Sequence, residues 1–428
     1  MNGDGGVTIT LPAEGTMHVG DEVAFAVAGS GAVSLLPVGT ETVAFTRNDS
    51  IATWSDQTPS GGAHAQGWNA VASDETGNRL VAVLGSSTPT GDIWTSSNAG
   101  LTWINQTSAT GRNPTAHNQY WYAVASDATG MKLVAASSAY GGPTYKGDLW
   151  TSSNGGLTWV NQTSAGAAHN KYWFSVASDA TGTNLVAVEQ SGGGIWTSTD
   201  AGATWVHQNV PGSNNAQAWM SVASDSTGTN LFTAVNSAGG QSGDLWTSSN
   251  MGISWVDQTT AGGSNPNAHY QPWTSVASDW TGANLAAVGY NMNGIWTSTN
   301  SGATWVHNNG PQDLESLASD ATGTMLVAGN NDLWLSSNGG ATLTNTTEGT
   351  AASGKAWRSL ASDASGSHLV AVDSGGDIWT YGNPSLPGET TLTVPGSIVG
   401  QSGSIVKLLY TGNGHFLVEY AFGSLAAN

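Results

Sequence analysis

Residues 177–188 read Ala-Ser-Asp-Ala-Thr-Gly-Thr-Asn-Leu-Val-Ala-Val, and this stretch decides the fold. It joins the end of a short strand, a tight turn and an apolar strand, and the chain contains seven copies of it. The aspartates that mark the copies, 41 to 54 residues apart, are Asp74, Asp127, Asp179, Asp225, Asp279, Asp320 and Asp363. Each copy is followed by an Ile-Trp or Leu-Trp pair, whose tryptophans are Trp94, Trp150, Trp196, Trp246, Trp296, Trp334 and Trp379.

Each repeat contains four short runs rich in Val, Ile, Thr and Trp, separated by Gly, Asn and Asp clusters. Examples are Val124 to Ser126, Leu80 to Val83 and Thr158 to Val160, together with the Ile-Trp-Thr-Ser phrase. Such runs are the expected signal of β-strands. A period of about 45 residues with four strands per repeat is typical of propeller blades. The sequence therefore predicts an all-β protein with a seven-bladed β-propeller over residues 50–382.

The seventh repeat ends after its third strand, at Tyr381. The missing fourth strand has a copy near the other end of the chain, where Ile51-Ala52-Thr53-Trp54 matches Ile253-Ser254-Trp255-Val256. We therefore expect residues 51–57 to complete the last blade and close the ring. Closure removes sheet edges that would otherwise be open to pairing with other chains.

The two ends of the chain, residues 1–49 and 383–428, do not follow the repeat. Both contain alternating apolar and polar runs, and ring closure places residues near 50 and 383 close together. We expect the flanks to form one small β-sandwich-like module. Phrases in each flank, Thr10 to Val23 and Lys407 to Phe416, resemble the β modules of phage and virus tail-fibre or spike proteins.

The turn between the third and fourth strands has the pattern Ser-x-Asn/Asp-x-Gly-x-Thr/Ser-Trp. Its copies are Ser96 to Trp103, Ser152 to Trp159, Ser198 to Trp205, Ser248 to Trp255, Ser298 to Trp305 and, without the final Trp, Ser336 to Leu343. This pattern resembles the Asp-box of the BNR/sialidase-like β-propellers. Only Asp200 keeps the aspartate of that motif, and asparagine replaces it elsewhere. Asn forms the same side-chain turn without charge, and Gly supplies the positive φ, so we expect the box to be structural.

Composition limits the classes of partner. Nine basic and 29 acidic residues give a net charge of −20, which disfavours nucleic acid and anionic membrane surfaces. No apolar run is long enough to span a membrane, and the N-terminus lacks the features of a signal peptide. There is no cysteine, hence no disulfide and no thiolate metal site, and no cofactor is expected.

Loop lengths distinguish the two faces of the predicted ring. The first and third turns of each repeat have constant length, whereas the second and fourth vary from 8 to 17 and from 15 to 24 residues between matched positions. Insertions gathered on one face usually mark a binding face.

Aromatic, histidine and amide side chains are concentrated in the longest loops of that face. Such groups suit sugar rings, whose apolar faces stack on aromatic rings while their hydroxyls form hydrogen bonds. The candidate ligand-binding residues are Arg112, His117, Tyr120, Trp121, Tyr140, Tyr145, His169, Tyr172, Trp173, His269, Tyr270 and Trp273.

Two structural alternatives apply to these residues. A Trp occurs six residues before the repeat Asp in six of the seven copies, which favours packing between blades. The histidines would then brace the loops. Metal binding is disfavoured because each His belongs to a different blade and no carboxylate accompanies it at ligand spacing.

The number and spacing of arginines and carboxylates disfavour catalysis. The sialidase resemblance implies three arginines around a substrate carboxylate, but of the four in this chain only Arg112 and Arg358 could reach the variable face. Another glycosidase would need paired carboxylates, and no spacing pairs the candidate acids Glu189, Asp313, Glu315 and Asp373. A further Asp-box-type propeller, the photosystem II assembly factor, has a basic patch without counterpart here.

The sequence thus predicts a non-enzymatic virion or fibre surface protein that displays a recognition propeller for a carbohydrate or receptor. The terminal module would attach it to virion or fibre proteins, and homo-oligomers are compatible with that role. Two alternatives stay open, a purely structural virion or surface component and a glycoside hydrolase of sialidase-like fold. We expect the protein on a virion or extracellular surface.

Overall fold

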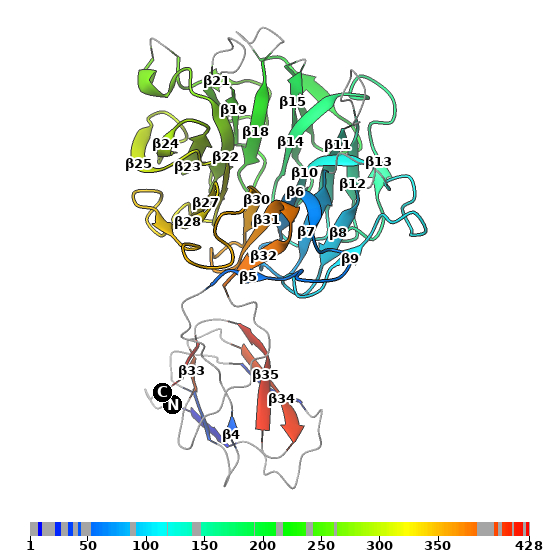
Figure 1. The fold of residues 1–428 in the computed structure, drawn as a ribbon, viewed down its shortest axis with the longest axis vertical. Coiled ribbons are helices and arrows are strands. Elements are labelled where there is room, and N and C mark those ends of the chain that lie inside the picture. Colours follow the sequence, from blue (N-terminus) through cyan, green and yellow to red (C-terminus); the bar gives the residue numbers. More distant parts are fainter. Residues whose placement is uncertain are drawn as a thin grey trace, which may run out of the picture. The chain divides into compact units, whose positions relative to one another are not determined.

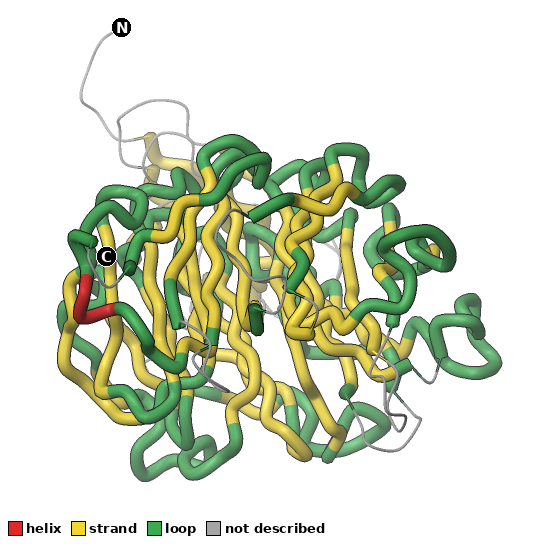
Figure 2. Tube along the Cα trace, turned by 90° about the horizontal axis from the view of Figure 1, so that it is seen from above, coloured by secondary structure: helices red, strands yellow, loops and turns green. Residues whose placement is uncertain are grey.

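The computed structural model describes residues 53–382, except 86–90, 118, 139–146, 192, 211–216, 237–242 and 261–262, together with the strands of both flanks. The chain divides into two compact units, one made of residues 1–52 and 385–428 and the other of residues 53–384. Strands and loops make up nearly all of the described residues, with one short 3-10 turn, Pro266–Ala268 (Figure 2).

The larger unit is built from four-stranded antiparallel sheets in which strands follow one another in chain order. Five of them are β10 (Tyr120–Ser126), β11 (Leu133–Ser138), β12 (Leu149–Ser152) and β13 (Val160–Asn161); β14 (Tyr172–Ser178), β15 (Leu185–Ser191), β16 (Ile195–Ser198) and β17 (Val206–Gln208); β18 (Trp219–Ser224), β19 (Leu231–Val235), β20 (Leu245–Ser248) and β21 (Val256–Asp257); β22 (Trp273–Ser278), β23 (Leu285–Gly289), β24 (Asn293–Ser298) and β25 (Val306–Gln312); and β26 (Ser316–Ser319), β27 (Leu326–Gly329), β28 (Leu333–Ser336) and β29 (Thr344–Asn345).

One larger sheet of this unit contains the first and last repeats. Its strands are β6 (Gln66–Ser73), β7 (Leu80–Leu84), β8 (Ile93–Ser96) and β9 (Ile104–Asn105), followed by β30 (Trp357–Ser362), β31 (Leu369–Gly376), β32 (Ile378–Tyr381) and β5 (Ser55–Asp56). The end of β31 pairs with the start of β6 and joins the two groups. The first strand of each repeat lies innermost and the fourth lies outermost (Figure 1).

The strand β5 comes from the N-terminal side of the chain and pairs with β32, the last strand of the seventh repeat. Trp54, which is 7% exposed, packs against Trp357 and Tyr381 with ring centroids 6.2 and 5.3 Å apart. Thr58 Oγ1 donates to Asp377 Oδ1 over 3.2 Å and accepts from the Ile378 backbone N–H over 2.9 Å. The first and last parts of this unit are therefore held together by pairing, aromatic packing and a buried polar contact.

The repeat aspartates organise the turn after each innermost strand. In the copy at Asp179, one carboxylate oxygen accepts the Thr181 hydroxyl over 2.9 Å, and the other accepts the backbone N–H of Thr183 over 2.8 Å. All seven aspartates are at most 5% exposed. A short side chain that bonds its own following backbone is the reason for Asp at this place.

The residue after each of these aspartates takes part in a cycle of main-chain hydrogen bonds. Each donates its N–H to the carbonyl oxygen of its equivalent in the next sheet, over 2.9 to 3.0 Å. The order is Glu75, Ala128, Ala180, Ser226, Trp280, Ala321, Ala364 and back to Glu75. The cycle links the ends of the innermost strands without using any side chain.

The turn between the third and fourth strands follows the Ser-x-Asn-x-Gly-x-Thr pattern. In the second copy, Ser152 Oγ accepts the Gly156 N–H over 3.0 Å and Asn154 Oδ1 accepts the Thr158 N–H over 2.9 Å. Gly156 has φ +86°, and a Cβ atom there would lie 2.7 Å from Thr151 Cγ2. Both the conformation and the close approach therefore require glycine.

Tryptophans fill the space between neighbouring sheets. Six of the seven repeat aspartates have a Trp six residues earlier, which is at most 1% exposed and packs edge-on against the Trp of the third strand, with ring centroids 5.9 to 6.3 Å apart. Second strands such as β7 and β19 are buried along their whole length, which explains their mostly apolar sequence.

The smaller unit combines strands from both flanks. Its four-stranded sheet has the order β2 (Glu22–Ala26), β34 (Ile405–Gly412), β35 (His415–Phe422) and β4 (Thr42–Val43). Two further pairs are β1 (Val7–Thr10) with β3 (Val33–Leu36), and β33 (Ile398–Gly400) with β36 (Leu425–Ala427). Strands of the N-terminal and C-terminal flanks thus share one sheet.

Candidate functional site

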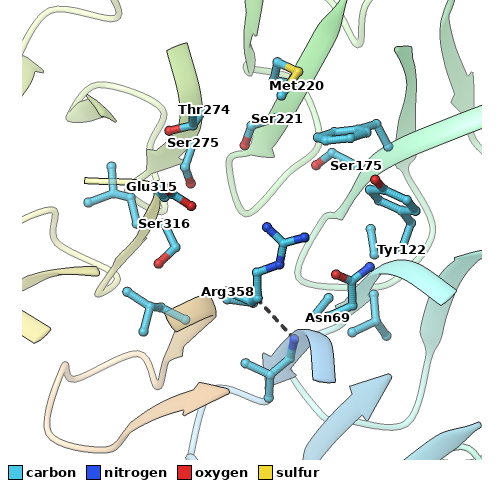
Figure 3. Close-up of a pocket in the computed structure, with 18 of the residues that line it drawn as sticks. Asn69, Tyr122, Ser175, Met220, Ser221, Thr274, Ser275, Glu315, Ser316 and Arg358 are labelled. Carbon is cyan, nitrogen blue, oxygen red and sulfur yellow. Dashed lines mark hydrogen bonds between the residues drawn. The ribbon is translucent and has the colours of Figure 1, made fainter. Parts of the chain in front are cut away.

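A cavity of about 330 Å³ lies among the innermost strands of the larger unit (Figure 3). We call it the axial cavity. Each repeat contributes to its wall the residue that lies five positions before the repeat aspartate. These residues are Asn69, Tyr122, Phe174, Met220, Thr274, Glu315 and Arg358.

A β-bulge directs most of these side chains. In six innermost strands the pairing register shifts across this position, as between Trp121 and Ala123 on either side of Tyr122. A bulge leaves the extra residue unpaired and re-aims its side chain. The backbone of the repeat is thus regular, while the residue that it presents to the cavity differs in every copy.

Two of the cavity residues carry charge, and both are exposed. Arg358 extends from β30 toward the middle of the cavity, and Glu315 lies just before β26 in the neighbouring sheet (Figure 3). Neither side chain has a hydrogen-bond or ion-pair partner among the described residues. All other residues that line the cavity are neutral.

An aromatic cluster adjoins the cavity at β10 and β14. The Tyr122 ring lies 5.5 Å from that of Tyr120, 6.1 Å from that of Tyr172 and 4.8 Å from that of Phe174, measured between centroids. All four rings are half-buried. The structure therefore brings the predicted residues Tyr120 and Tyr172 together through Tyr122, a cavity-lining residue.

The predicted histidines each contact an aspartate at the start of the preceding third strand. His117, His169 and His269 place Nδ1 at 2.8, 2.9 and 2.6 Å from Oδ1 of Asp92, Asp148 and Asp244, respectively. His64 makes the equivalent contact with Asp377 at 2.8 Å, and this hydrogen bond raises the pKa of His64. Each of these contacts stabilises the loop that connects one sheet to the next.

The remaining predicted residues are divided between the interior and the surface. Trp121, Trp173 and Trp273 are fully buried, so the prediction that they contact a ligand is wrong; their indoles fill the space between sheets. Arg112 and Tyr270 are exposed, and the Tyr270 ring packs against His269 rather than in the cluster. Tyr140 and Tyr145 lie outside the described residues.

A positional signal could have found the cavity residues in the sequence. The position five residues before the aspartate is the variable one in an otherwise regular strand: it holds Asn, Tyr, Phe, Met, Thr, Glu and Arg in turn. A repeat position that changes chemical character in every copy is under no shared packing requirement. Counting back from the aspartate therefore lists the seven residues directly.

In two sheets a carboxylate on the fourth strand lies near a carboxylate at the start of the third strand. The pairs are Asp257 with Asp244 and Asp56 with Asp377. Asn105 and Asn161 donate to Asp92 and Asp148 over 2.8 and 2.9 Å, whereas the fourth sheet has Asp257 at the equivalent position. Burial, with the nearby Asp244 carboxylate, raises the pKa of Asp257 to about 6. Burial, with Asp377, likewise raises the pKa of Asp56 in β5.

Within the described part of the chain, His, Asp and Glu side chains form no group of three or more suited to a metal ion. The same residues include no helix with the length and apolar character needed to cross a bilayer.

No family model matches the chain, and no curated protein matches it. Several solved structures are similar to it. YCF48 from Cyanidioschyzon merolae, at 12% identity, aligns with a TM-score of 0.56 over 77% of this chain and 99% of its own. YCF48 bound to D1 peptide, also at 12% identity, gives 0.53 over 80% of this chain and 99% of its own. Both are β-propellers. This fold is a β-propeller.

A GH74 enzyme from Niastella koreensis also resembles the chain, with a TM-score of 0.44, 15% identity, and coverage of 92% of this chain and 79% of its own. The β-propeller fold shared with the two YCF48 structures makes each four-stranded group of the larger unit a propeller blade. The axial cavity lies among the innermost strands of these blades.

Proposed function

We propose that this protein is a closed seven-bladed propeller that recognises a carbohydrate without catalysis. Three features support the closed ring: the pairing of β5 with β32, the packing of Trp54, and the cycle of main-chain hydrogen bonds that returns from Ala364 to Glu75. The turns with the Ser-x-Asn-x-Gly pattern support membership of the Asp-box class.

The aromatic cluster carries the functional proposal. Tyr120, Tyr122 and Tyr172 present partly exposed rings beside a cavity whose wall contains amide, hydroxyl, carboxylate and guanidinium groups. Sugars pair an apolar ring face, which stacks on aromatic side chains, with hydroxyls that exchange hydrogen bonds with such polar groups. The histidines act as loop braces in this proposal, not as ligand contacts.

Binding is favoured over hydrolysis by the number of acids in the cavity wall. Glu315 is the single carboxylate among the residues that line it. Glycosidases with a carboxylate pair need two, about 5–9.5 Å apart, on either side of the scissile bond. A lone carboxylate can accept sugar hydroxyls but does not supply both halves of that mechanism.

The terminal unit would attach the propeller to a larger particle, for which we propose a virion or fibre. Its support is the sheet shared by β2, β4, β34 and β35 and the fibre-like phrases in both flanks. Display in several copies would convert weak binding of single sugars into useful adhesion.

A glycan array probed with the full-length protein tests the proposal. Tyr120→Ala and Tyr172→Ala are each expected to lower binding about fivefold, and together at least tenfold, because aromatic stacking is worth about 1 kcal/mol per ring. Tyr290→Ala is the matched control, since Tyr290 is 51% exposed and belongs to the fifth blade.

Unchanged glycan binding by the double variant would place the site elsewhere. If the wild-type protein binds no glycan and no host cell, the recognition proposal fails and the structural role replaces it. Release of free sugar from a bound glycan would overturn the non-enzymatic part.

A further inference from the structure

The axial cavity contains two opposite charges that do not pair with each other. Arg358 and Glu315 come from adjacent blades, and both are exposed within a wall that is otherwise neutral. Structural ion pairs on propeller blades do form in this chain, as between Lys355 and Asp373, where Nζ and Oδ2 are 3.5 Å apart. The cavity pair is thus left available to a ligand.

The guanidinium of Arg358 sets one requirement on such a ligand. It is planar, permanently charged and suited to bidentate hydrogen bonds with a carboxylate. Glu315 sets the second, because a free carboxylate is matched by an ammonium group or by hydroxyl donors. A ligand that meets both charges carries a carboxylate and an ammonium group in one molecule.

The charge of the whole chain supports a ligand with no net charge. With a net charge of −20, the protein repels anions over distances of several ångströms, and Glu315 adds to that repulsion at short range. A purely cationic ligand would instead be repelled by the guanidinium of Arg358. A zwitterion avoids both penalties while its two charged groups meet opposite charges.

The rest of the wall indicates what lies beside the charged groups. Tyr122, Phe174 and Met220 line the cavity on three neighbouring blades, and serine hydroxyls such as that of Ser221 lie one position further along the strands. The volume of about 330 Å³ is at the lower end for small-molecule sites. It suits a molecule the size of an amino acid.

We propose that the axial cavity binds a zwitterionic small molecule with an apolar or aromatic substituent, of the α-amino-acid type. The carboxylate of the ligand lies against Arg358, its ammonium group against Glu315, and its substituent against Tyr122 and Phe174. This site goes beyond glycan recognition and does not depend on it, because its specificity comes from the two charges.

Isothermal titration of the full-length protein at pH 7 tests the proposal with phenylalanine as the probe. Hydrocinnamate, which lacks the ammonium group, and phenethylamine, which lacks the carboxylate, are the matched analogues. We expect phenylalanine to bind one molecule per chain, and each analogue to bind at least tenfold more weakly, since a charge-assisted hydrogen bond contributes about 1.5–3 kcal/mol.

Two variants separate the charged contacts. Arg358→Gln is expected to weaken phenylalanine binding at least tenfold without weakening phenethylamine, and Glu315→Gln to weaken phenylalanine without weakening hydrocinnamate. Arg79→Gln, which changes an exposed arginine outside the cavity, serves as the control and leaves binding unchanged. The unfolding temperature of each variant verifies that the fold is intact.

Three results would overturn the proposal: no heat of binding with phenylalanine, equal affinity for phenylalanine and hydrocinnamate, or unchanged affinity in both cavity variants. Phenylalanine binding in a protein that binds no glycan would remove the carbohydrate proposal and leave this one standing. Glycan binding without phenylalanine binding would do the reverse.

Discussion

The replacement Asp257→Asn tests the physical account of the carboxylate pair in the fourth blade. Equivalent positions in the first two blades hold Asn105 and Asn161, whose amide groups donate to Asp92 and Asp148. Asp257 cannot donate when ionised, and burial with the neighbouring Asp244 raises its pKa from 3.8 to about 6. The amide at residue 257 would keep the acceptor for the Thr259 N–H and add the missing donor.

The expected gain follows from the size of the shift. A rise of about two pKa units corresponds to about 3 kcal/mol at about 1.4 kcal/mol per unit. Because the Asp257 carboxyl is partly exposed, solvent screening reduces this, and we expect a stabilisation of about 1–2 kcal/mol at pH 8. For a unit of this size that is roughly a 2 °C rise in unfolding temperature.

The direction of the raised pKa of Asp257 determines how stability changes with pH. Since the folded-state pKa of Asp257 lies above its unfolded value, the folded protein binds more protons between pH 4 and 6, and wild-type stability falls as pH rises through that window. The gain from Asp257→Asn is thus present above about pH 6 and disappears toward pH 4. Calorimetric unfolding at pH 8 and pH 4.5 measures it, with Asn161→Asp as the reverse variant. A gain that is equal at both pH values, or a loss at pH 8, would refute the reasoning.

Further predictions concern closure and packing. Asp56→Asn in β5 is expected to stabilise the protein above neutral pH in the same manner, measured by the same scans. A chain of residues 58–384, which lacks Trp54 and β5, is expected to aggregate or to unfold at lower temperature than a chain of residues 53–384; equal stability of the two monomers would show that β5 does not close the ring. Ala180→Pro removes one N–H from the main-chain cycle and is expected to lower the unfolding temperature, whereas Ala180→Ser leaves it unchanged. Trp173→Ala is expected to cost about 3–5 kcal/mol of folding free energy, while Tyr172→Ala has a small effect on stability and acts on glycan binding.

The repeat made most of the fold predictable from sequence. Strands, turn chemistry and the Ser-x-Asn-x-Gly hairpin recur with so little variation that local rules suffice, and each repeat must pack against a copy of itself. The buried tryptophans show where this reasoning misled the choice of site. Trp121 and Trp173 are adjacent in sequence to the half-buried Tyr120 and Tyr172, but successive strand residues point to opposite faces.

The missed contacts depend on long-range pairing. His117 and Asp92 are 25 residues apart, and the pairing of β8 with β9 brings them together; His64 and Asp377 meet only because the ends of the propeller do. A search for carboxylates at local ligand spacing therefore finds neither. The sequence offers Arg358 and Glu315 only as separate candidates for catalysis. Arg358 lines the cavity at the bulge of β30, whereas Glu315 lines it from the position just before β26, and neither placement is visible in local sequence spacing.

The cycle of main-chain hydrogen bonds has a consequence for how such a protein can change. Its seven positions accept residues as different as Glu75, Ala128 and Trp280, because any amino acid except proline supplies the N–H and carbonyl that the cycle uses. Six residues earlier on the same strands are the side chains of the axial cavity. At one end of each innermost strand, the main-chain cycle forms with any side chain except that of proline. The residue at the other end can therefore differ from copy to copy and adapt the axial cavity to a new ligand.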